Sequence, residues 1–151
     1  MNPINTPSAF SQKPKERRNT MNKLDELFRD FEFNEKTEIG ISEINGLKLP
    51  EDYLDFMRAH NGGEGAVGEY GYACLFRLEE LENVNRDYDV TRNWHGCVVF
   101  GSDMGGMLLA YNYEKQVYCE IDACNVDEDT YMTICDSFET FFMAFAKERE
   151  E

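Results

Sequence analysis

The stretch from Leu49 to Gly65, LPEDYLDFMRAHNGGEG, constrains the fold most, because it reads as one short helix with both ends marked. Pro50 suits the first helical position, where no N–H is needed, and the two acidic residues after it favour the positive end of the helix dipole. Asn61 to Gly63 can adopt the left-handed conformation that ends a helix. The apolar residues follow the helical spacing i, i+3, i+4 and i+7: Tyr53, Phe56, Met57 and His60. We therefore predict a helix, a sharp turn and an extended run from Glu64.

Short apolar runs separated by polar turns occupy most of the remaining chain, and they favour a sheet. Strands are predicted within residues 64–78, 97–100, 107–111, 117–122 and 131–135. Further helices are predicted over residues 24–31, 78–88 and 137–145, and an exposed, irregular segment over residues 87–96. These patterns predict an α+β fold with an antiparallel sheet of about five or six strands, packed with helices.

Residues 1–20 differ in composition from the rest of the chain. They contain three prolines and a basic cluster, Lys13, Lys15, Arg17 and Arg18, against a single acidic residue. This composition predicts a disordered extension, and a basic docking arm is its functional alternative. Residues 21–151 then form a single domain, a size that can bury about 68–70% of its unfolded surface.

The charge of the predicted domain bears on the kind of partner it can bind. The whole chain has a formal net charge of −15, whereas residues 21–151 hold 11 basic and 29 acidic residues, a net charge of −18. Such a surface repels nucleic acid and anionic membranes and attracts basic proteins. Solubility alone explains the same composition, and charge by itself favours that simpler interpretation. No apolar run approaches the roughly 20 residues of a membrane span.

The sequence shows no arrangement typical of a catalytic or metal site. The five cysteines form no C-x-x-C pair, and only two histidines, His60 and His95, are present, without the cysteine spacing of a zinc site. Each cysteine lies in an apolar or acidic stretch, which raises the pKa of a thiol and disfavours a nucleophile. We therefore predict free thiols in a reduced cytoplasmic protein, with no catalytic residue, metal or cofactor. A pocket that joins either histidine to a cysteine would favour a small enzyme or ligand-binding domain instead.

A protein-binding surface is the remaining candidate, and two groups of residues could form it. The first follows the central helix: Glu64, Glu69, Tyr70 and Tyr72. The second lies in the irregular segment: Asp87, Tyr88, Asp89 and Trp94. Aromatic residues are typical interface anchors, and acidic residues steer a basic partner. The alternative is that the aromatic residues belong to the core, although the polar neighbours of Trp94 favour its exposure.

Three segments also resemble the SUKH superfamily, which joins fungal cell-wall regulators to bacterial immunity proteins. They are the central stretch LPEDYLDFMRAHNGGEG, the turn FGSDMGG between two apolar runs, and Ser137-Phe138 at the start of the last helix. The resemblance covers roughly residues 22 to 149. It implies structural roles, and no catalytic ones, for the matching positions Leu49, Pro50, Tyr53, Phe56, Asn61, Gly62, Gly63, Gly101 and Gly106.

This resemblance sharpens the functional expectation. It implies an immunity protein that binds and blocks a cognate toxin, often a basic nuclease or deaminase. The fungal branch of the superfamily instead implies an intracellular scaffold without a toxin partner. The sequence leaves the oligomeric state open, a homo-oligomer included.

Overall fold

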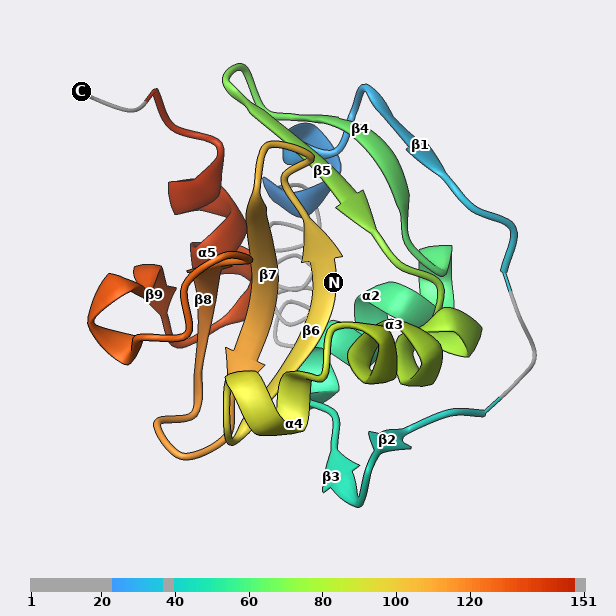
Figure 1. The fold of residues 1–151 in the computed structure, drawn as a ribbon. Helices are drawn as coiled ribbons and strands as arrows, with labels where there is room; N and C mark the ends of the chain where they lie inside the picture. Colours follow the sequence, from blue (N-terminus) through green and yellow to red (C-terminus); the bar gives the residue numbers. More distant parts are fainter. Residues whose placement is uncertain (1–22, 37–39, 149–151) are drawn as a thin grey trace, which may run out of the picture.

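The computed structural model describes residues 23–36 and 40–148, so the predicted extension, residues 1–20, lies outside the described residues. Its centre is a seven-stranded sheet in the order β1-β4-β5-β6-β7-β8-β9, with each strand antiparallel to its neighbours (Figure 1). The strands are β1 (Phe31–Phe33), β4 (Gly63–Val67), β5 (Gly71–Leu75), β6 (Cys97–Ser102), β7 (Met107–Asn112), β8 (Val117–Asp122) and β9 (Met132–Cys135). A separate hairpin pairs β2 (Glu43–Ile44) with β3 (Leu47–Lys48). The α+β prediction is confirmed, with more strands than expected.

The unexpected strand is β1, which occupies the end of the helix predicted over residues 24–31. In the described chain the helix covers only residues 23–27, and Phe31 then pairs with Gly65 of β4. Three residues are too few to show the alternation of a strand, so pairing with β4, which no local pattern reveals, decides their conformation.

Helices α2 (Glu51–His60) and α5 (Phe138–Phe145) pack on one face of the sheet and form the main core. The phenylalanines of α5 are buried there beside the aromatic residues of α2 and the strand residues Phe100 and Tyr118. Asp52, in the first turn of α2, joins these elements, because its carboxylate accepts hydrogen bonds from the Tyr118 hydroxyl (2.6 Å) and the Phe138 N–H (2.8 Å). The predicted last helix is confirmed, and Ser137 caps its start.

Among the described residues, the opposite face of the sheet is covered over β6, β7 and β8 only. Helix α4 (Val90–Asn93) lies there, and Val90 and Trp94 form a second core with strand residues that include Val99 and Leu108. The prediction of an exposed, irregular segment over residues 87–96 is therefore wrong around Val90 and Trp94. Only four residues long, α4 shows no periodic pattern, so the sequence does not reveal its apolar contact with the sheet.

An asparagine side chain completes the edge of β6 where β5 diverges from it. β5 pairs with β6 only at Cys74 and Leu75, and α3 (Leu81–Asp87) lies beside the remainder of β6. The buried amide of Asn85 donates to the Val99 carbonyl and accepts from the Val99 N–H, both at 2.8 Å. The side chain thus supplies the donor and acceptor that a neighbouring strand would otherwise provide.

The end of α2 is held by Asn61, a buried residue in the left-handed conformation (φ 56°). Its N–H donates to the Met57 carbonyl (2.7 Å), and its side-chain oxygen accepts from the Leu78 N–H (3.0 Å). Its side-chain nitrogen donates to the Glu35 carbonyl (3.2 Å) and to Glu79 Oε1 (3.1 Å). The predicted turn is confirmed, with Pro50 as the residue just before the helix.

Gly62 should be intolerant of any side chain, because it has φ +80° and a Cβ there would lie 2.4 Å from the Leu75 carbonyl oxygen. We expect Gly62→Ala to lower the free energy of unfolding by more than the ~1 kcal/mol of an average substitution. Gly105→Ala is the control, because its nearest neighbour outside the turn backbone would be Asp103 Oδ1 at 3.6 Å. Equal chemical-denaturation midpoints for the two variants would show that the close packing of Gly62 is unimportant.

The buried face of α5 gives a second stability prediction. Phe141 is fully buried, whereas Met143 on the same helix is exposed. Phe141→Ala should cost roughly 3–5 kcal/mol, because it removes a large side chain and leaves a cavity. Met143→Ala should cost less than about 0.5 kcal/mol. Urea titration measures the free energy of unfolding of both variants. A small effect at Phe141 would contradict the assigned core.

Candidate functional site

The first group of predicted binding residues reaches the second sheet face over β1, β4 and β5, a part that residues 23–36 and 40–148 leave uncovered. Ala73 and Leu75 point into the main core, so the alternate residues Tyr72 and Cys74 point to the opposite face. Glu64 lies across from Cys74 on β4, and Glu32 lies across from Glu64 on β1. We call Glu32, Glu64, Tyr72 and Cys74 the hairpin face.

Tyr72 and Glu64 form a fixed pair on the hairpin face. The Tyr72 hydroxyl donates to Glu64 Oε2 at 2.8 Å, and this bond raises the pKa of Tyr72 because it stabilises the protonated phenol. Burial raises the pKa of the Cys74 thiol, and the negative charges of Glu64 and Glu80 raise it further. The face therefore combines a hydrogen-bonded carboxylate with a thiol whose ionisation is disfavoured.

The negative charge of the hairpin face is not neutralised by ion pairs within the described residues. The exposed ion pairs found there join Arg58 to Glu51 and Asp55, Arg92 to Asp89, and Lys115 to Glu128. Glu32 and Glu64 belong to none of them. An uncompensated acidic surface of this kind attracts a cationic partner over a distance set by the ionic strength.

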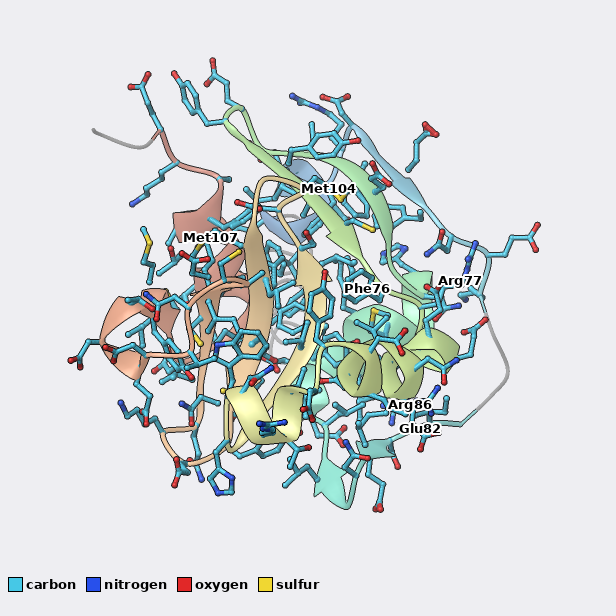
Figure 2. The ribbon with its side chains drawn as sticks, in the orientation of Figure 1. Phe76, Arg77, Glu82, Arg86, Met104 and Met107 are labelled. Carbon is cyan, nitrogen blue, oxygen red and sulfur yellow. The ribbon has the colours of Figure 1, made fainter. Side chains whose placement is uncertain are left out.

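Two apolar residues that the sequence did not single out border the hairpin face. β5 pairs with β6 at Cys74 and Ser102, so the β6–β7 turn begins beside the hairpin face and carries Met104, which is 60% exposed (Figure 2). Phe76, two residues beyond Cys74, is half-buried. The sequence signal for Met104 is an apolar residue at the tip of a predicted polar turn, and no local pattern places it near Tyr72.

The remaining residues of the first predicted group lie at the end of the same hairpin. Glu69 and Tyr70 belong to the turn between β4 and β5, and Tyr70 is 56% exposed. Both are therefore available to a partner beside Glu64 and Tyr72. Their contribution to binding stays a prediction.

The second predicted group lies elsewhere and is only partly accessible. Asp87, Tyr88 and Asp89 are exposed where α3 meets α4, whereas Trp94 is only 2% exposed. Trp94 packs in the second core and its Nε1–H donates to the Asn125 carbonyl at 3.1 Å. The expectation that Trp94 is exposed is wrong, because its indole fills the space between α4 and the sheet and cannot reach a partner without unfolding.

The two histidines lie in different surroundings. His60 stacks on Phe33 with ring centroids 3.8 Å apart, and burial lowers its pKa; His95 is exposed. The described residues include no group of three or more metal-ligating side chains.

Two surface hollows, of about 770 and 300 Å³, have no histidine or cysteine among their described lining residues. Within the described part of the chain, no helix is long and apolar enough to cross a membrane.

The antiparallel sheet with helices on both faces defines an α+β domain whose most distinctive surface is acidic and aromatic. The family model described as the SMI1 / KNR4 family (SUKH-1) matches residues 40–144. The chain therefore belongs to the SUKH-1 family, and the match spans α2, the hairpin face except Glu32, and most of α5. No curated protein matched the sequence.

The buried thiols give a prediction about reactivity and pH. Burial raises the pKa of Cys97 to about 11 and of Cys119 to about 12, whereas Cys124 is exposed. At pH 8 we expect alkylation of the native protein to modify Cys124 first and the two buried thiols only after unfolding. Because the unfolded thiols ionise near pH 9, their contribution to stability is complete below that pH and is lost as the pH rises towards 12. Equal alkylation rates, measured by mass spectrometry, would contradict this assignment.

Proposed function

We propose that this protein is a non-catalytic immunity protein that binds and blocks a cognate bacterial toxin with a basic surface. The uncompensated acidic hairpin face, beside exposed aromatic and apolar side chains, is the observation that carries the proposal. Membership in the SUKH-1 family supports it, because the superfamily includes immunity proteins. The raised pKa values of the Cys74, Cys97 and Cys119 thiols and the stacking of His60 on Phe33 disfavour a Cys–His nucleophile pair.

The hairpin face suits a partner in two physically different ways. Glu64 and Glu69 contribute to a long-range field that speeds association with a cationic protein and weakens as salt screens it. Tyr70 and Tyr72 offer apolar area with a polar tip, the combination that stabilises a docked complex. The partner is expected to present lysine or arginine around an apolar contact.

The same surface would serve the scaffold alternative, in which the protein assembles cytoplasmic partners of the cell-wall-regulator type. The family that the chain belongs to carries the name of that branch. A toxin encoded beside this gene and neutralised by the protein favours immunity. The absence of protection combined with capture of a stable cellular complex through the hairpin face favours the scaffold.

The two kinds of residue should affect binding kinetics differently. Glu64→Gln with Glu69→Gln should mainly slow association with the candidate toxin and reduce its salt dependence, because both changes weaken the field. Tyr70→Ala should mainly speed dissociation, by about tenfold for each 1.4 kcal/mol of lost contact. Surface-plasmon-resonance kinetics across a salt series measures both effects.

Two controls make this test specific. Asp127→Asn with Asp129→Asn removes the same charge from the exposed segment between β8 and β9, and should leave association nearly unchanged. Asp87→Asn with Asp89→Asn tests the α3–α4 junction separately. In cells, Tyr70→Ala should restore toxin activity while the thermal unfolding temperature stays unchanged. If the native protein neither binds nor protects against the toxin, the immunity proposal fails.

A further inference from the structure

The hairpin face is a sheet surface left uncovered by the described chain, although the adjoining half of the same face is covered. α4 and Trp94 pack over β6, β7 and β8, whereas Tyr72 and Met104 remain exposed and Phe76 is half-buried. Figure 2 labels Met104 and Phe76. Partly apolar area of this kind, bordered by Glu32 and Glu64, fits an occupant that carries both positive charge and apolar groups.

The chain itself contains such a segment, outside the described residues. Lys13, Lys15, Arg17 and Arg18 fall within six consecutive positions, and Phe10 precedes them. These four cations stand against a net charge of −18 on residues 21–151. Charge complementarity within a single chain is therefore strong, and the segment is attached permanently to the surface that would attract it.

The first described residues lie close to the β4–β5 hairpin. The Gly68 N–H donates to the Leu27 carbonyl at 2.7 Å, which holds the first helical turn against the end of β4. β1 pairs with β4 only as far as Gly65, and beyond it a hollow of about 770 Å³ extends between Lys23 and Glu69. The described lining of this hollow includes the acids Glu26, Asp30 and Glu69 and the cations Lys23 and Arg29.

The length of chain between Lys23 and the basic segment sets how far that segment can extend from the described structure. At about 3.5 Å per extended residue, the five residues from Lys23 back to Arg18 span up to roughly 18 Å, and the eight residues back to Lys15 roughly 28 Å. A short tether gives an effective concentration on the order of millimolar, so even weak electrostatic contacts are occupied.

We propose that residues 10–18 dock on the hairpin face of their own chain and compete there with the cationic partner. This inference deepens the proposed function, because it assigns a regulator to the same surface. Docking would bring the charges of Lys15, Arg17 and Arg18 to Glu64 and Glu69, and the partner would displace them when it binds. The segment thus shields exposed apolar area in the free protein and slows association of weakly basic proteins.

Zero-length carbodiimide coupling of the full-length protein tests this without any toxin. The reagent joins lysine amines to carboxylates in contact, and mass spectrometry identifies the pairs. We expect Lys13 and Lys15 to couple to Glu32, Glu64 and Glu69 several-fold more often than to Asp127 and Asp129, which are exposed between β8 and β9. Mixing ¹⁴N and ¹⁵N chains separates coupling within one chain from coupling between two.

Salt and matched variants complete the test. Raising the salt from about 0.01 M to 1 M shortens the Debye length from about 30 Å to about 3 Å and should abolish the preference. Arg17→Gln with Arg18→Gln should reduce coupling of Lys15 to Glu64 and Glu69 several-fold. Arg58→Gln with Arg92→Gln changes the net charge equally on α2 and α4 and should not reduce it.

Two results would overturn the proposal: coupling spread evenly over all exposed carboxylates, or coupling found only between chains. Neither result bears on toxin neutralisation, which the co-expression assay measures separately. If the proposal holds, the Arg17→Gln, Arg18→Gln protein should also associate faster with the cationic partner than the native protein does.

Discussion

The buried amide of Asn61 is the interaction on which the rest of the structure depends. Its left-handed backbone ends α2, and its side chain bonds to the chain after β1 and to the start of the segment after β5. Three stretches distant in sequence are thereby tied at one point. Because a buried amide left without partners costs about 1–3 kcal/mol for each lost group, this junction disfavours other arrangements of these stretches.

From this junction the chain reverses at Gly62 and Gly63 into β4, which places Glu64 on the solvent-exposed side of the sheet. The turn is held by close packing as well as by hydrogen bonds. Other backbone segments lie too close to Gly62 and Gly63 to admit a side chain at either position. The turn that closes α2 therefore also determines which face of β4 carries the acidic residue. The structural motif and the candidate binding surface are in this sense one feature.

The sheet has two unlike faces, and their difference gives the protein its candidate site. One face is filled by α2 and α5, whose aromatic side chains pack in a continuous core. The other is covered by α4 over β6 to β8, and the described part of the chain leaves it open over β1, β4 and β5. The Asn85 side chain bonds to the edge of β6 where β5 turns away. β5 can therefore diverge without leaving the Val99 N–H and carbonyl without hydrogen-bond partners.

Local patterns were sufficient for α2, α5, the β4–β5 hairpin and the β6–β7 turn, because each depends on contacts between residues near in sequence. They failed for β1 and α4, which are short and owe their conformation to distant partners. Trp94 illustrates the reason: its polar neighbours predicted exposure, but the burial of an indole depends on what packs over it.

The fold class, the marked ends of α2 and the acidic character of the domain follow from the sequence, since composition and periodicity are properties of the chain alone. Which acidic and aromatic residues share a surface depends on the tertiary structure. It joined Glu64 to Tyr72, brought the Met104 turn beside them and removed Trp94 from solvent. The physical reason is that strand register and helix packing are set by long-range contacts, and these are not encoded in any short stretch of sequence.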